Sequence, residues 1–253
     1  TRLSQENTFE VSWAGSEANA AVALAQMLQS CANADVSEGN HTYHTEFVTA
    51  IPGNPLGEKC IAELKSLGVD GEHIVRDRSD CSRMGLFFLE QGVMMRPSRV
   101  IYDRKNSSFA NVRVDTFDWD EILKEASWFH TSGITPALSN GAKDAAIQAV
   151  KTASKRNIPV SVDLNYRKTL WETPAKAQST MKDILKYADY IIGNEEDFAR
   201  MVTGETEPLK NTVKEQTDLF KENAKNVFKL FPQVKGIFTS IRIAHTAEHN
   251  HWA

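Results

Sequence analysis

Apolar and polar positions follow two alternating rhythms along most of the chain. Short apolar runs typical of buried strands are followed by longer segments whose apolar residues recur at helical spacing. Strands are predicted at residues 9–13, 46–52, 127–133, 158–167, 189–194 and 234–241. Helices are predicted at residues 14–29, 58–68, 118–126, 139–157, 173–188, 195–204 and 212–230. This order is typical of βαβ units, so we expect an α/β fold with a mainly parallel sheet.

Two further strand-like runs, residues 84–92 and 98–104, follow one another without a helix between them. They are amphipathic and close in sequence, so we expect them to pair antiparallel. With residues 9–13 they would form a small β appendage on the same edge of the domain. Residues 30–45 are polar and aperiodic, which predicts a surface loop. Because no repeat or low-complexity linker interrupts the chain, we expect one main domain over residues 1–253.

The composition argues against some classes of function but does not identify one. The 253 residues carry 33 acidic and 29 basic side chains, so nothing favours nucleic acid or a membrane surface as partner. Three cysteines without a CxxC pair argue against a disulfide framework and favour the cytoplasm. No apolar run approaches the roughly 18 residues of a membrane span. The chain opens on polar residues without Met and closes on a polar, His-rich stretch, so we expect it to be part of a longer protein.

Four polar clusters fall where parallel α/β sheets bind ligands, beyond the carboxyl ends of strands and at helix N-termini. They are residues 163–167, 194–197, 240–242 and 15–19. Each also has a structural interpretation, because Asp163 and Asn165 are suited to cap the following helix, and the acidic residues 195–197 to stabilise a helix N-terminus. We favour a ligand site because the four clusters share one predicted edge. Walker, GxGxxG, HExxH and GxSxG motifs are absent, which argues against P-loop, dinucleotide-binding, zincin and hydrolase classes.

Tyr102 and Arg104 lie on one face of a predicted strand, since side chains alternate with a period of two. A planar guanidinium beside a phenol suits bidentate capture of a carboxylate. Phe87 and Phe88 in the neighbouring run would supply an apolar wall. The alternative is an exposed pair on an edge strand with no ligand, and the residue pattern alone does not choose between the two.

Segments spread over nearly the whole chain carry a resemblance to a known family. They are FEVSWAGSEANAAVALAQ, FVTAIPGNPLGE, GLFFLEQG with RPSRVIYDR, FHTSGITPALS, VDLNYR, IIGNEEDF with TGE, and IFTSIR. In this order they resemble the ribokinase-like (PfkB) carbohydrate kinases. The resemblance implies a ribokinase-like three-layer fold, in which a mainly parallel central sheet has helices on both faces. It also implies a small β lid built from residues 9–13 and 84–104.

The resemblance further implies where substrates bind. Residues that match sugar-binding positions of the family are Gly15, Asn19, Phe87, Tyr102, Arg104, Ile134 and Arg167. Residues that match nucleotide-binding positions are Asn165, Asn194, Asp197, Ser240 and Arg242. Tyr102 and Arg104 match lid contacts to a keto acid, and Arg167 matches a charge stabiliser near the phosphates. Asn194 and Asp197 match the N-x-x-E motif that organises Mg²⁺ and phosphate; because Asp is one methylene shorter than Glu, we expect Asp197 to contact the metal through water.

Three departures accompany the resemblance. The family's opening strand is missing, residues 30–45 differ from the expected short Gly-containing turn, and the G-A-G-D motif is absent. In the family this motif supplies an anion hole and the Asp that takes the proton of the substrate hydroxyl. We therefore expect the catalytic base to lie beyond Ala253, and the chain as written to transfer phosphate poorly.

The activity implied by the resemblance is ATP- and Mg²⁺-dependent phosphorylation of 2-keto-3-deoxygluconate, a sugar acid whose carboxylate Arg104 would hold. One alternative is another PfkB-type kinase, fructokinase-like or ribokinase-like, acting on a neutral sugar. A second alternative is a truncated homologue that binds sugar without turnover. We also expect a homo-oligomer, in the simplest case a dimer, that pairs through the β lid.

Overall fold

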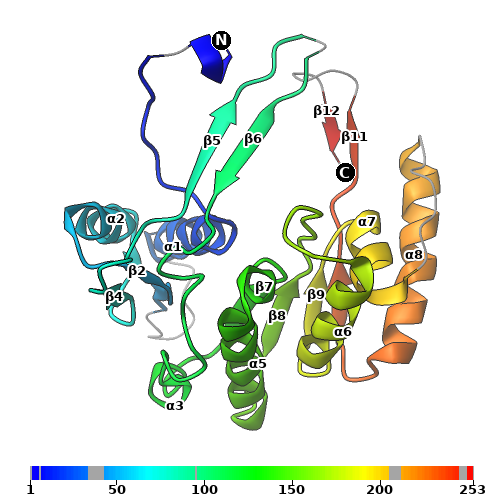
Figure 1. Cartoon of the computed structure of the whole chain (residues 1–253). Coiled ribbons are helices and arrows are strands. Elements are labelled where there is room, and N and C mark those ends of the chain that lie inside the picture. Colours follow the sequence, from blue (N-terminus) through cyan, green and yellow to red (C-terminus); the bar gives the residue numbers. More distant parts are fainter. Residues whose placement is uncertain are drawn as a thin grey trace. The chain divides into compact units, whose positions relative to one another are not determined.

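The computed structural model describes residues 2–5, 7–33, 43–94, 96–204, 212–244 and 250–252 (Figure 1). The chain forms two compact units. The N-terminal unit comprises Arg2–Phe87 and Tyr102–Val112, and the sheet unit comprises Phe88–Ile101 and the residues from Arg113 onward. Within the described residues, no helix is both long enough and apolar enough to cross a membrane. The prediction that residues 1–253 form a single domain with a β lid inside it stays a prediction.

The sheet unit is built on a four-stranded parallel sheet with the strand order β10-β9-β8-β7. These strands are β7 (Phe129–Ser132), β8 (Val160–Asp163), β9 (Tyr190–Ile192) and β10 (Gly236–Phe238). The side chains of Val160, Val162 and Ile191, on the two central strands, are fully buried. Continuous β-branched runs of this kind are typical of parallel strands covered by helices. The predicted α/β class with a mainly parallel sheet is confirmed.

Helices follow the strands of this sheet in alternating order. They are α3 (Trp119–Ile122), α4 (Thr135–Leu138), α5 (Asn140–Lys155), α6 (Pro174–Leu185), α7 (Glu195–Phe198), the π-helical turn η2 (Ala199–Thr203) and α8 (Val213–Leu230). Helix α5 packs on β7 and β8 through a stripe of buried alanines, and α6 packs against α5 and η2. The hydroxyl of Ser139 caps α5 and that of Thr173 caps α6, each accepting a backbone N–H of the first turn.

The N-terminal unit contains helices and short strands around a small core. Its elements are the 3₁₀ turn η1 (Leu3–Gln5), α1 (Ser16–Asn33), α2 (Pro55–Ser66), β1 (Thr45–Glu46), β2 (Ala50–Pro52), β3 (Val69–Asp70) and β4 (Val75–Asp77). Strand β1 pairs with β3 and β2 with β4, both in parallel. The buried side chains at the centre are Ala25, Ile51, Ile61, Leu64, Val69 and Ile74.

A two-stranded hairpin joins β5 (Leu86–Glu90) to β6 (Arg99–Asp103). The two strands run in opposite directions (Figure 1), which confirms the predicted antiparallel pair. Near the turn, Arg96 Nη1 lies 2.6 Å from Glu90 Oε1 and ties the two arms together. Several large apolar side chains of this hairpin are exposed, among them Leu89 and Val100.

The strand predicted at residues 9–13 is wrong. This segment is extended but irregular, and the side chains of Phe9 and Val11 are 54% and 71% exposed. An alternating pattern becomes a strand only when a neighbouring strand accepts from its backbone N–H groups and donates to its C=O groups. Among the described residues no strand is paired with residues 9–13, so the structure gives this segment no place in the β appendage.

Other predicted boundaries shift without changing the order of the elements. Helix α1 continues to Asn33, into the loop predicted at residues 30–45, of which 34–42 lie outside the described residues. The helix predicted at residues 195–204 is α-helical only through Phe198, because it continues as the π-helical turn that ends at Gly204. Four of the described strands were not predicted. They are β3 and β4, which pair in parallel with β1 and β2, and β11 (Arg242–Ala244) and β12 (Asn250–Trp252), which pair antiparallel.

Candidate functional site

The four parallel strands of the sheet unit end level with one another. Ser132, Asp163, Ile192 and Phe238 form one row of register partners across β7, β8, β9 and β10. Backbone hydrogen bonds continue the row, since Leu164 N donates to Ile192 O and Gly193 N to Phe238 O. Two positions beyond this row stand four predicted site residues, Ile134, Asn165, Asn194 and Ser240. The register therefore brings these four backbone positions to one edge of the sheet, where ligands of parallel sheets bind.

The capping interpretation of Asp163 and Asn165 is wrong. Helix α6 begins at Pro174, and its cap is the hydroxyl of Thr173, which accepts the N–H of Lys176. Asn165 instead adopts a left-handed backbone conformation with φ of 43° directly after β8. Non-glycine residues in this conformation are uncommon and concentrate at functional sites.

The interpretation that the acidic residues 195–197 stabilise a helix N-terminus is confirmed, and Asn194 adds a cap that was not predicted. Asn194 Oδ1 accepts the N–H of Asp197 at 2.9 Å, and Asp197 Oδ2 accepts the N–H of Asn194 at 3.0 Å, which forms a capping box at the start of α7. The other oxygen, Asp197 Oδ1, accepts the N–H of Tyr166 at 2.8 Å. Asp197 therefore holds the segment after β8 against the segment after β9.

Burial raises the pKa of Asp197. Only 7% of this residue is exposed, and desolvation raises the pKa of its carboxyl above the ordinary value. The N–H groups of Asn194 and Tyr166 and the positive charge of Arg167 act in the opposite direction, because each favours the ionised form and lowers this pKa. Arg167 is exposed at the edge of the sheet, and its Nη1 donates to the carbonyl of Tyr166 at 2.9 Å.

The side chains at this edge of the sheet fit a metal ion only if it is bound through water and phosphates. Both oxygens of Asp197 already accept backbone N–H groups, and the described part of the chain gathers no three His, Cys, Asp or Glu side chains that could hold a metal. Mg²⁺ commonly keeps several waters and takes its other ligands from phosphates and one or two carboxylates. The residues therefore fit Mg²⁺ bound through water and nucleotide phosphates, and they do not fit a protein cage.

The last predicted nucleotide contacts lie after β10. Ser240 is exposed in the turn that follows this strand. Arg242 is the first residue of β11, where its backbone is the register partner of Trp252. Both belong to the sheet unit, together with Asn165, Asn194 and Asp197.

The predicted acid-binding pair lies at the base of the hairpin, in the N-terminal unit. The guanidinium carbon of Arg104 stands 4.0 Å from the centre of the Tyr102 ring, a cation–π contact. The Phe87 ring lies 6.5 Å from the Tyr102 ring, centre to centre. Tyr102 is 44% exposed and Phe87 37% exposed, so both rings remain accessible to a ligand. The prediction that Tyr102 and Arg104 share one face is confirmed by their contact.

Arg83 is a neighbour of this pair that the sequence analysis did not single out. Its guanidinium forms a two-pronged ion pair with Asp103, with Nη2 2.6 Å from Oδ2 and Nη1 3.1 Å from Oδ1. The two residues are twenty positions apart, and no periodic pattern signals such a pair. The sequence signals this ion pair only by a basic residue shortly before the first strand of the hairpin and an acidic residue at the end of the second.

Gly15 and Asn19 lie at the start of α1 in the N-terminal unit. Asn19 Oδ1 is 3.4 Å from the N–H of Gly15, and Asn19 N donates to Gly15 O at 2.8 Å. Both residues are exposed. They were expected to share the sheet edge with the other polar clusters, and because they belong to the other unit this stays a prediction.

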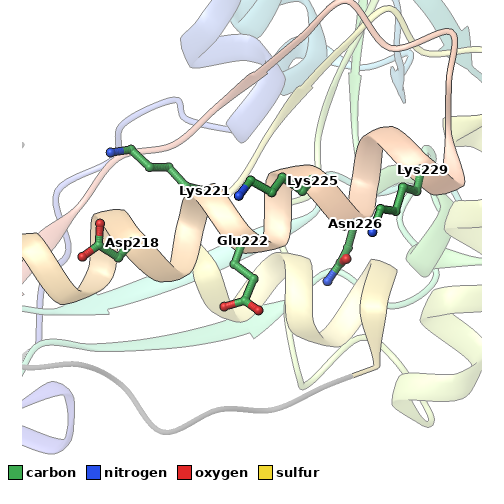
Figure 2. Close-up of a pocket in the computed structure, with 6 residues that line it drawn as sticks. All are labelled: Asp218, Lys221, Glu222, Lys225, Asn226 and Lys229. Atoms are coloured by element: carbon green, nitrogen blue, oxygen red, sulfur yellow. The ribbon is translucent and has the colours of Figure 1, made fainter.

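A shallow depression of about 390 Å³ runs along α8 and is unrelated to these residues. Figure 2 shows its lining as six polar side chains that project from a single helix, Asp218, Lys221, Glu222, Lys225, Asn226 and Lys229. Three lysines are offset by two carboxylates, and no second element closes the depression. This arrangement is typical of a solvated helix face.

Comparison with known proteins agrees with the fold. The profile of the pfkB family carbohydrate kinases matches residues 1–230. The 2-dehydro-3-deoxygalactonokinase of Haloferax volcanii is 33% identical over 197 residues, which cover 78% of this chain and 56% of that protein. The 2-dehydro-3-deoxygluconokinase of Thermoproteus tenax is 27% identical over 201 residues, covering 79% of this chain and 55% of that protein. The chain thus spans a little over half the length of these curated relatives.

A solved structure extends the similarity to the whole chain. The crystal structure of the 2-dehydro-3-deoxygluconokinase of Thermotoga maritima is 35% identical and superposes with a TM-score of 0.86. The match covers 100% of this chain and 70% of that one. With the α/β fold and the level edge of its parallel sheet, the chain belongs to the pfkB family of carbohydrate kinases.

Proposed function

We propose that the protein transfers the γ-phosphoryl group of ATP to the primary hydroxyl of 2-keto-3-deoxygluconate or a close epimer. The observation that carries this proposal is the Arg104 guanidinium over the Tyr102 ring, with its central carbon 4.0 Å from the ring centre. A planar guanidinium presents two parallel N–H groups that match the two oxygens of a carboxylate. The names of the relatives from Haloferax volcanii, Thermoproteus tenax and Thermotoga maritima support a keto-deoxy sugar acid as substrate.

In this proposal the sugar acid is held by the residues that match sugar-binding positions of the family. Arg104 and Tyr102 bind the carboxylate, and Phe87 supplies an apolar wall against the deoxy carbon. Gly15 and Asn19 hold sugar hydroxyls, as in the family pattern. The remaining contacts are Ile134 and Arg167, of which Arg167 offsets negative charge near the transferring group.

The nucleotide is proposed to bind at the level edge of the sheet. Asn165 and Asn194 stand two positions beyond the row of register partners, and Ser240 and Arg242 follow β10. Asp197 orders this edge and would hold Mg²⁺ through a bound water. The metal ion would neutralise charge on the phosphates when bound. The amide and guanidinium groups of the chain would orient the phosphates.

A substrate comparison tests the proposal. Binding of 2-keto-3-deoxygluconate and of fructose is measured by calorimetry, and ADP release is measured with each sugar. The sugar acid is expected to bind more tightly and, at the low rate expected of a chain without the G-A-G-D motif, to be the better acceptor. Arg104→Ala is expected to weaken binding of the acid about 10- to 100-fold, the range of a charged hydrogen-bonded contact, and to change fructose binding less than about twofold.

Arg99→Ala is the control for this comparison. Arg99 is exposed on the same strand as Tyr102, at a position of opposite parity to Arg104, so its loss should leave both affinities unchanged. Equal losses for the acid and for fructose in Arg104→Ala would contradict acid recognition. Tighter binding of fructose by the unmodified protein would favour a fructokinase-like activity instead.

We also propose that the protein acts in the cytoplasm and pairs with a second copy through the hairpin. The thiols of Cys31, Cys60 and Cys81 are free, in keeping with a reducing compartment. Covering the exposed side chains of Leu89 and Val100 would remove apolar surface from water, which favours association. Sedimentation should give a dimer that Leu89→Glu converts to monomer, and a monomeric unmodified protein would refute the pairing.

A further inference from the structure

The direction in which Arg104 projects depends on the backbone of its two sequence neighbours. Arg83 contacts both of them. Its guanidinium forms the two-pronged ion pair with the Asp103 carboxylate, and its Nη2 also lies 3.3 Å from the carbonyl of Asp103. Its Nη1 donates to the carbonyl of Lys105 at 2.9 Å. One side chain therefore holds the residue before Arg104 and the residue after it.

The main chain of Arg83 is itself anchored to the segment that follows Arg104. Arg83 N donates to Ser108 Oγ at 3.2 Å, and Ser108 N donates to Arg83 O at 2.9 Å. Ser107 N donates to the carbonyl of Arg104 at 3.2 Å, and both serines are buried. Arg83 is thus a fixed support for this segment.

Space beside Arg104 is also limited. Gly85 lies next to it, and a methyl group on Gly85 would come 3.3 Å from the Arg104 Cβ. Arg83 holds the main chain at Asp103 and at Lys105, where a turn begins, and so fixes the backbone from which the Arg104 side chain projects. The guanidinium of Arg104 lies over the Tyr102 ring.

We propose that Arg83 is a positioning residue for acid recognition, acting through Arg104 by fixing the backbone on both sides of it. The inference rests on the proposed function, in which Arg104 binds the carboxylate of a sugar acid. Arg83 itself contacts no substrate in this proposal. Preorganisation of the guanidinium lowers the entropy lost when the acid binds, and so raises affinity for the acid without changing affinity for a neutral sugar.

The chain offers a closely matched control for Arg83→Ala. Arg76 pairs with Glu58 in the same unit, also with two prongs and also with a shortest distance of 2.6 Å. The side chains of Arg83 and Asp103 are 35% and 52% exposed, and those of Arg76 and Glu58 are 37% and 54% exposed. Each arginine lowers the pKa of its partner carboxyl through the hydrogen-bonded pair. Arg76→Ala therefore removes an equivalent ion pair that does not touch Arg104.

Calorimetric titration with 2-keto-3-deoxygluconate and with fructose gives the first test. Arg83→Ala should weaken binding of the acid about tenfold and leave fructose binding within about twofold. Arg76→Ala should change neither affinity, and both variants should unfold at similar temperatures. Arg83→Lys, which keeps the charge but not the two-pronged contact, should recover part of the loss. Equal loss of both sugars, or the same loss in Arg76→Ala, would overturn the proposal.

The double variant Arg83→Ala/Arg104→Ala tests whether Arg83 acts through Arg104. Once Arg104 is gone, removing Arg83 should cost the acid no further affinity, so the two effects should not add. Additive effects would mean that Arg83 acts on the acid independently, which contradicts the proposal.

A measurement without ligand separates this inference from the proposed function. If the unmodified protein binds no sugar acid, the proposed function fails, and the order parameter of the Arg104 Nε–H bond measured by NMR decides the role of Arg83. That order parameter should fall in Arg83→Ala and stay unchanged in Arg76→Ala. An unchanged value in both variants would show that Arg83 does not position Arg104.

Discussion

Asp197 on helix α7 accepts the backbone N–H of Tyr166, thirty-one positions earlier in the chain, at 2.8 Å. Its second carboxylate oxygen accepts the N–H of Asn194. A single buried side chain therefore joins the two segments that leave β8 and β9 at the level edge of the sheet. In a family where these segments are expected to hold a nucleotide, stability and site geometry depend on the same group.

Removing this carboxylate should destabilise the sheet unit. Asp197→Ala leaves two partly buried N–H groups without this acceptor and should lower the free energy of unfolding by about 2 to 4 kcal/mol. Asp197→Asn keeps one acceptor and should cost about 1 to 2 kcal/mol. Urea titration measures both losses. Asp183→Ala, which removes an exposed carboxylate paired only with Lys186, should cost less than about 0.5 kcal/mol.

The charge of Asp197 should give stability a measurable pH dependence. Because burial raises the pKa of Asp197, the folded protein holds this proton more tightly than the unfolded chain does. The group therefore favours folding below its ordinary pKa, and this contribution is lost as the pH rises through the raised value. The stability of the unmodified protein relative to Asp197→Asn should fall as the pH rises above the ordinary pKa of an aspartate, about 4. A relative stability that rises with pH instead would mean that the N–H donors outweigh burial.

Gly133 should tolerate no side chain. A methyl group there would lie 2.2 Å from the carbonyl oxygen of Leu164 and 2.7 Å from the Met201 methyl. Gly133→Ala must push β7 away from β8 just before Ile134, and should cost about 1 to 3 kcal/mol of unfolding free energy. The control is Gly15→Ala, because a methyl group on Gly15 meets only Ala18 at 3.6 Å. Thermal unfolding that moved equally in both variants would contradict this packing.

Substitutions at Tyr102 should separate the role of its ring from that of its hydroxyl. Tyr102→Phe keeps the surface on which Arg104 stacks, whereas Tyr102→Leu removes it. A cation–π contact at a half-exposed site contributes about 0.5 to 1 kcal/mol, so the Leu variant should bind 2-keto-3-deoxygluconate about two- to fivefold more weakly than the Phe variant. Calorimetry measures this ratio. Equal affinities for the two variants would mean that the ring does not support the guanidinium.

The sheet could be predicted from the sequence because its signal is local. Val160, Val162 and Ile191 sit in short β-branched runs between helical patterns, and such runs become central strands wherever helices cover them. The segment at residues 9–13 has a similar alternation but lies outside any sheet, since the sequence pattern does not reveal whether a partner strand is available. Strand pairing is a property of two segments, and only one of them is visible in a local pattern.

The site was predictable to the extent that it follows from strand ends. Asn165, Asn194 and Ser240 were placed at one edge by counting from the strands, and the register bears out that count. The sequence did not predict that Asp197 accepts hydrogen bonds from two loops, because its second partner is a backbone N–H of another loop. Contacts such as that of Arg83 with the Lys105 carbonyl likewise depend on tertiary structure alone.

The in-register row across β7 to β10 has a consequence for engineering this chain. Adding one residue inside β8, between Val162 and Asp163, would turn every following side chain to the opposite face and advance the loop by about 3.3 Å. The loop after β8 would then be displaced, while the loops after β7, β9 and β10 would keep their positions. Length changes are tolerable before the amino ends of these strands, where loops can absorb them. New loops grafted onto the carboxyl ends must leave the number of residues within each strand unchanged as far as the register row, which is Ser132, Asp163, Ile192 and Phe238.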